Sequence, residues 1–206
     1  MRIKALLALL LAAVLLCSLT ACGGIQSGET SGQATETSEK NTEKQAKTDA
    51  ASAATSFLSL LTELRWGEAA NMTENELKTK MPGINDMEWG VPADSDMAEY
   101  EEMLKLCMQN TRNIVADAEN TRITDENYIV PCQLEMAPVR TLIDLIAQCG
   151  WTTVAEVETN INMLQDLPKE TVQVTLLMKE EKGPSGLIDY KVCAASDISA
   201  LSVIFE

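Results

Sequence analysis

The segment TVQVTLLMKEEKGPSGLIDYKVCA, residues 171–194, alternates between apolar and polar side chains on both sides of a glycine- and proline-containing turn. Val172, Val174, Leu176 and Met178 share one side of the first half, and Ile188, Tyr190 and Val192 share one side of the second. A period of two indicates half-buried strands, and the intervening residues 182–186 are typical of a turn. The segment therefore predicts a β-hairpin that nearly ends the chain.

A second strand pair is predicted earlier in the chain. Residues 128–136 also alternate, and a shorter strand at 121–124 can pair with them across a polar turn. Pro131 lacks a backbone donor, so we expect this strand to lie at an edge or to contain a bulge.

Helical spacing of apolar residues appears before, between and after these strands. It predicts a helix over 50–70, a short one from Thr73 to about 81, and a longer one over 96–119. A loop containing Trp89 occupies 82–95, and the intervening segments 139–149 and 152–166 are predicted to be helical. Residues 200–205 form either a strand or a helix. The pattern predicts one α+β domain over residues 50–206.

The first residues have the organisation of an export signal. Arg2 and Lys4 precede an unbroken apolar run from Ala5 to Cys17. Because a membrane-spanning helix needs about 20 apolar residues, the run is better interpreted as a signal peptide than as a permanent anchor. An ordinary secretory cleavage site and an uncleaved helix are the alternatives.

Leu19-Thr20-Ala21-Cys22 resembles the lipobox of bacterial lipoproteins. The resemblance implies that the Cys22 thiol carries a diacylglycerol and that the signal peptide, residues 1–21, is cleaved between Ala21 and Cys22. It places the protein at the cell membrane, lipid-anchored and facing outside the cytoplasm. Residues 22–49 are rich in Ser, Thr and Glu, and we expect a flexible tether there, spanning about 30 Å.

The order of elements resembles the nuclear transport factor two-like, or cystatin-like, domain found in small Gram-positive lipoproteins. The opening AATSFLSLLTELRWGEAANMT (53–73) and the closing VTLLMKEEKGPSGLIDYKV (174–192) carry the resemblance. It implies N-terminal helices packed on a curved antiparallel sheet, often cone-like with a pocket. Helices at 138–168 would be an insertion.

Composition excludes several functions. Without residues 1–21 the chain keeps 14 of its 16 basic residues against 31 acidic ones, a net charge of −17. This balance argues against nucleic acid and against electrostatic docking on anionic lipid. The chain has no histidine, which removes the usual neutral-pH base and the commonest metal ligand.

Cysteines and acidic residues offer two further candidate sites. Cys107, Cys132, Cys149 and Cys193 can form two disulfides or remain free, and their apolar surroundings favour free thiols. An acidic stretch between Asp86 and Glu102 lacks the glycine and glutamate of a calcium loop, so we expect a solvated acidic face and no metal or other cofactor. The acids considered are Asp86, Glu88, Asp94, Asp96, Glu99, Glu101 and Glu102.

No catalytic constellation is visible, so the sequence favours a domain that binds an envelope protein or a small ligand, or that has a structural role, over an enzyme. The alternative is a pocket enzyme that uses carboxylate or tyrosine chemistry, for which Tyr128, Tyr190, Asp144 and Asp189 are the candidates. The ligand-pocket candidates are Trp89, Tyr128 and Tyr190. Trp66 and Trp151 are better interpreted as core residues.

Overall fold

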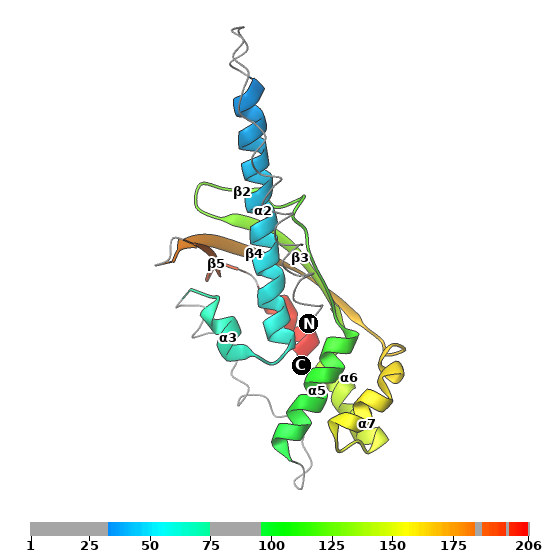
Figure 1. Ribbon diagram of the computed structural model, residues 1–206. Helices are drawn as coiled ribbons and strands as arrows, with labels where there is room; N and C mark the ends of the chain where they lie inside the picture. The colour runs from blue at the N-terminus through cyan, green and yellow to red at the C-terminus, as the bar shows by residue number, and fades with distance from the viewer. Residues whose placement is uncertain (1–32, 75–95, 184–186, 197, 206) are drawn as a thin grey trace, which may run out of the picture. The chain divides into compact units, whose positions relative to one another are not determined.

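The computed structural model, which describes residues 33–74, 96–183, 187–196 and 198–205, contains an antiparallel sheet and a larger share of helix (Figure 1). The chain divides into two compact units, Met1–Glu39 and Lys40–Glu206. The packing described below is that within the second unit. The strands are ordered β1-β3-β4-β5, and β2 also pairs with β3. Their bounds are β1 Asn113–Ala116, β2 Arg122–Ile123, β3 Tyr128–Met136, β4 Glu170–Lys182 and β5 Ile188–Val192.

The predicted hairpin is confirmed. β4 pairs with β5 from Met178↔Val192 to Lys182↔Ile188 and with β3 from Tyr128↔Met178 to Met136↔Glu170. The apolar side of β4 is buried, whereas Gln173 on the other face is exposed and donates to Gln133 across the sheet at 2.8 Å. The sheet curls into a half-barrel, and helices precede it in the chain. The α+β class with a curved antiparallel sheet is therefore confirmed.

Pro131 does not lie in an edge strand, because β3 pairs with β4 on one side and with β1 and β2 on the other. β1 ends at Ala116, opposite Cys132, and β2 begins opposite Ile129. The proline falls in the gap between them, where its carbonyl accepts from Asp117 N at 2.9 Å. The backbone N–H that Pro131 lacks would therefore face a position where neither β1 nor β2 pairs with β3. For this reason the proline is tolerated inside the sheet.

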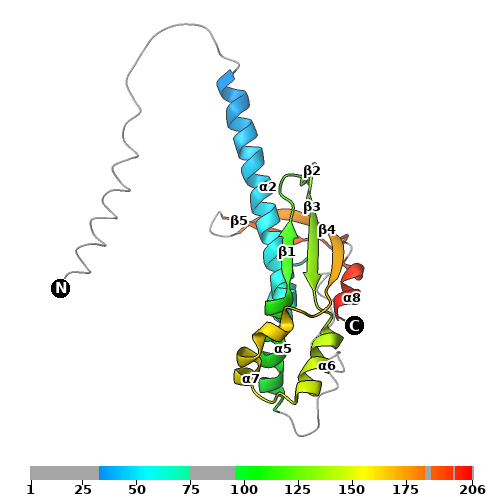
Figure 2. The ribbon, with the colours of Figure 1, turned by 90° about the vertical axis from the view of Figure 1, so that its right-hand side faces the viewer.

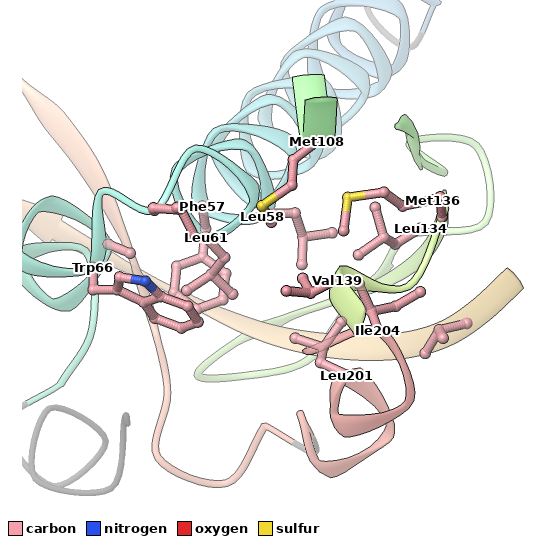
Figure 3. Packing of buried hydrophobic residues seen from close by; sticks show 14 of the residues in the cluster. Phe57, Leu58, Leu61, Trp66, Met108, Leu134, Met136, Val139, Leu201 and Ile204 are labelled. Carbon is pink, nitrogen blue, oxygen red and sulfur yellow. The ribbon is translucent and has the colours of Figure 1, made fainter. Parts of the chain in front are cut away.

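Two helices contribute side chains to the core on the buried side of the sheet. α2 spans Gln33–Thr62 and α5 spans Met97–Thr111. Figure 3 shows Phe57, Leu58 and Leu61 of α2 and Met108 of α5 beside β3 side chains, and all of them belong to one hydrophobic core. The inner face is therefore filled by side chains.

The helix predicted over 50–70 and the tether predicted over 22–49 both need correction. α2 already begins at Gln33 and ends at Thr62, and α3 (Trp66–Asn71) follows after Leu64, whose φ is 56°. Residues 40–45 are exposed, so no burial holds them helical. Helix-favouring side chains and pairs four residues apart stabilise this stretch instead, as in Glu43–Lys47 at 2.7 Å.

The helix predicted over 96–119 ends earlier, at Thr111. Arg112 is extended, with ψ 148°, and Asn113–Ala116 form β1 against β3. Ile114 continues the helical spacing in the sequence, but it is β-branched and pairs with Leu134. Strand pairing has therefore overridden the local period.

The remaining elements agree with expectation where they are described. α6 (Val139–Cys149), α7 (Val154–Thr159) and the 3-10 helix η3 (Ile161–Leu164) fill the predicted helical segments between β3 and β4, and in Figure 2 they gather with α5 beyond one end of the strands. The last described residues, 199–205, are helical, as η4 (Ser199–Leu201) and α8 (Ser202–Phe205). The predicted short helix up to residue 81 and the loop 82–95 lie outside the described residues from position 75 onward.

None of the described helices has both the length and the apolar composition needed to cross a bilayer.

Candidate functional site

A groove of about 510 Å³ opens between α2 and the edge strand β5. Residues 49–56 of α2 form one wall and residues 188–191 of β5 form the other, and Met72 also lines the groove. The lining comprises Asp49, Ser52, Ala53, Ser56, Met72, Ile188, Asp189, Tyr190 and Lys191. All of these residues belong to the unit Lys40–Glu206.

The lining follows from the periods of the two elements. Asp49, Ser52, Ala53 and Ser56 are spaced three or four apart and share one face of α2. The side chains are small, and the Ser52 and Ser56 hydroxyls donate to carbonyls of their own helix at 2.8 and 3.0 Å. This face therefore leaves room beside β5, whereas the neighbouring face carries Phe57 and Leu58 into the core.

Tyr190 joins the two walls. Its hydroxyl lies 3.3 Å from the Ala46 carbonyl of α2 and 3.4 Å from Oε1 of Glu180 on β4. Tyr128 donates to the same Glu180 oxygen at 2.5 Å, and the two tyrosine rings meet edge to face at 5.5 Å. The structure thus brings together two tyrosines from β3 and β5 around one carboxylate.

Both tyrosines are neutral donors at pH 7. Burial raises the pKa of Tyr190 to about 12, and the negative charges of Glu180 and Asp49 contribute. Burial also raises the pKa of Tyr128, and its hydrogen bond to Glu180 raises it further. A phenol that holds its proton so tightly is a poor base near neutrality, so the cluster is suited to donating hydrogen bonds.

The residues nominated from sequence are thus only partly brought together. Tyr190 and Asp189 line the groove. Tyr128 does not line it, but its ring packs edge to face on the Tyr190 ring. Asp144 lies on α6, 3.4 Å from Arg140 Nε. Trp89 lies outside the described residues.

Trp66 and Trp151 are buried, as the sequence favoured. Trp66 packs edge to face on Phe205, with ring centroids 5.3 Å apart. Its Nε1 has no hydrogen-bond partner among the residues that the structure describes. Neither tryptophan is part of the groove.

Sequence reasoning missed the α2 wall of the groove. Asp49 falls in the predicted tether, Ala53 counts among the apolar residues of the helix predicted over 50–70, and Ser52 and Ser56 are too small to stand out. Their spacing of three and four residues was the available signal, since it places them on one helical face.

Of the described acids of the predicted acidic face, Asp96, Glu99 and Glu102 have local roles, and the fourth, Glu101, lies in α5. Asp96 accepts from Ala98 N at 3.0 Å and caps α5, and Glu99 accepts from Val154 N at 2.7 Å. Glu102 pairs with Lys105 at 2.6 Å. Asp86, Glu88 and Asp94 lie outside the described residues. Within those that are described, no three His, Cys, Asp or Glu side chains are grouped to hold a metal ion.

The four cysteines of the domain are free thiols. Cys107, Cys132 and Cys193 are buried, and burial raises the pKa of each, to about 12 for the first two and about 11 for Cys193. Cys149 is exposed at the end of α6.

No protein-family model, no curated protein and no solved structure matches this chain, so the groove between α2 and β5 is identified by its own geometry.

Proposed function

We propose that the protein is an extracytoplasmic lipoprotein, anchored through Cys22, whose α+β domain binds a partner protein or a small ligand at the membrane surface. The observation that carries the proposal is the sequence Leu19-Thr20-Ala21-Cys22, placed directly after a basic start and an apolar run. The thiolate of cysteine is the nucleophile that accepts the lipid.

The energetics of anchoring support the same assignment. One acyl chain holds a protein to a bilayer only marginally, whereas two hold it stably. The processed chain carries a net charge of −17, so anionic headgroups repel it and the diacylglycerol supplies the attachment. The domain then stands off the surface, where it can meet other envelope components.

A binding role is favoured over a pocket enzyme. The inner face of the sheet is filled by core side chains such as Leu134 and Leu176, so a deep catalytic pocket has no space there. The groove beside β5 is open and is lined by the neutral Tyr190, whose ring contacts Tyr128 outside the lining, rather than by a nucleophile with its base. The preceding helices and the curled sheet also support the proposed likeness to nuclear transport factor two-like domains.

Cys22→Ala tests the anchor. We expect this variant to accumulate as an unprocessed precursor or to appear in the medium, whereas Cys17→Ala, a matched change five residues earlier, is processed normally. Mass spectrometry of the native N-terminus should give a diacylglycerol-modified Cys22 as the first residue. A Cys22→Ala protein that is cleaved and membrane-bound like the unsubstituted one would refute the proposal.

A further inference from the structure

β5 forms one end of the described sheet, and its outer edge is only partly paired (Figure 1). At Val192 the outer edge is occupied, because Val192 N donates to Met72 O at 2.8 Å and Glu74 N donates to Val192 O at 3.0 Å. These two bonds form a parallel bridge between Thr73 and Val192. The bridge shows that the outer edge of β5 pairs with an extended backbone at Val192.

Backbone alternation identifies the groups that remain free. Cys193 N donates to Leu177 O of β4 at 2.8 Å, so odd-numbered residues of β5 point their backbone groups towards β4. Even-numbered residues point outward, as Val192 does, and these include Ile188 and Tyr190. Among the described residues, no backbone group pairs with the N–H of either. Within the part of the chain that the structure describes, the backbone N–H and C=O groups of Ile188 and Tyr190 therefore have no partner on the outer side of β5.

The groove provides space beside this edge. Ile188 and Tyr190 line it from β5, and Ile188 remains 51% exposed. The small side chains of α2 form the opposite wall. An extended peptide needs this combination, because its backbone pairs with a strand edge while alternate side chains enter a neighbouring groove.

The charged residues around the groove indicate which kind of side chain a bound peptide would place in it. The Tyr190 hydroxyl lies 3.4 Å from Glu180, and Asp49 lines the groove with it. Lys191, the only basic residue of the lining, directs its ammonium to the Asn71 carbonyl at 2.7 Å. A lysine or arginine over the Tyr190 ring would gain two carboxylates and a cation–π contact.

We propose that the outer edge of β5 binds an extended peptide segment of a partner protein, which adds a strand along Ile188–Tyr190 and places a basic side chain at Tyr190. This inference rests on the proposed binding function, because it names the partner's chemistry. It does not depend on lipid at Cys22, so the two proposals fail separately.

The first test leaves the protein unchanged. A library of random twelve-residue peptides is selected on the purified full chain, and the strongest binder is methylated at each backbone nitrogen in turn. Strand addition predicts at least tenfold weaker binding at every second residue and little change at those between. A uniform profile would overturn the proposal, as would a library that yields no binder.

Hydrogen exchange locates the site. In the free protein the Tyr190 amide should exchange rapidly, whereas those of Asp189 and Lys191, paired with β4, should be slow. Binding should protect the Tyr190 amide selectively. Protection in the free protein, whether by the chain itself or by a second copy, would overturn the proposal.

Two pairs of variants complete the test. Ile188→Pro removes the outward donor and should weaken binding at least tenfold, whereas Ile188→Ala removes the same side chain, keeps the donor and should bind nearly as well. Asp49→Asn should weaken a peptide containing lysine several-fold, and Glu158→Gln, the same charge change on exposed α7, should not. Equal binding by both members of either pair contradicts the mode proposed.

Discussion

Nη2 of Arg112 lies 2.7 Å from Oε1 of Glu63, so the residue that follows α5 is bonded to the residue that follows α2. Nη1 of the same guanidinium donates to the Thr62 hydroxyl at 2.6 Å and to the Ser59 carbonyl at 3.1 Å. A cation at the C-terminal end of a helix is favourable for the helix dipole. Arg112 thus joins two helices at the point where the chain turns into β1.

Arg112→Ala should destabilise the protein by about 2 kcal/mol, because it leaves Thr62 and Glu63 without their shared partner. Urea unfolding followed by circular dichroism measures the loss. Arg140→Ala is the matched control, since Arg140 and Asp144 form an exposed pair at 3.4 Å. That change should stay within about 0.5 kcal/mol, and equal losses would contradict the role given to Arg112.

The same pair predicts a pH dependence. Burial acts to raise the pKa of Glu63, but hydrogen bonds from Arg112 and Arg65 outweigh it and hold the pKa below its ordinary value. The stabilisation is therefore complete above the unfolded-state pKa of about 4.3 and is lost as the pH falls through the folded-state pKa. Unfolding measured between pH 7 and 3 should show a smaller decrease in Arg112→Ala than in the unsubstituted protein. Parallel curves would mean that the pair does not contribute.

Two glycines should respond to alanine with opposite signs. Gly150 ends α6 with φ 66°, and Gly67 lies within α3, and neither would meet an atom within 4 Å of an added Cβ. Gly150→Ala should cost about 1 kcal/mol because of its left-handed backbone, and Gly67→Ala should gain about 0.5 kcal/mol from lower chain entropy. Thermal unfolding of both variants checks the signs.

The sheet core can be tested at Leu134, which is fully buried on β3 opposite Val172. Leu134→Ala should cost about 3 kcal/mol because it removes buried methyl groups and leaves a cavity. Val115→Ala on the neighbouring strand β1 should cost less than about 0.5 kcal/mol, since Val115 is 49% exposed. Similar losses in urea unfolding would show that the inner face is not filled as described.

Thiol labelling examines both the fold and the anchor. In the protein extracted from membranes, a maleimide at pH 7 should react with Cys149 alone, because the other three thiols are buried and their pKa values are raised. Denaturant should bring the number of labelled thiols to four. A fifth thiol, mapped to Cys22, would contradict lipidation.

The sheet could be predicted from the sequence because a period of two is a local signal. β3 has the predicted bounds, and β4 and β5 form the predicted hairpin. The position of Pro131 could not be predicted, because it depends on where β1 and β2 end against β3. The predicted end of α5 was wrong for the same reason. Ile114 fits both the helical period and the strand period, and only its pairing with Leu134 decides between them.

The candidate site was harder to predict than the fold. Tyr190 and Tyr128 are both candidates from the sequence, but only the strand register places them beside Glu180. The α2 wall consists of residues with small side chains, whose grouping indicates no site until a strand edge lies opposite. A groove formed by two elements about 140 residues apart in the chain, as Ala46 and Tyr190 are, has no local signature.

The pairing of β3 with β4 also limits when this part of the sheet can fold during synthesis. Residue 136 meets 170 and residue 128 meets 178, so α6, α7 and η3 must all be synthesised before this ladder closes. A chain that emerges N-terminus first, from a ribosome or through a translocation pore, exposes the apolar side of β3 to its surroundings until β4 has also emerged. Holding chaperones are therefore of most use to this protein while its last third is still being made.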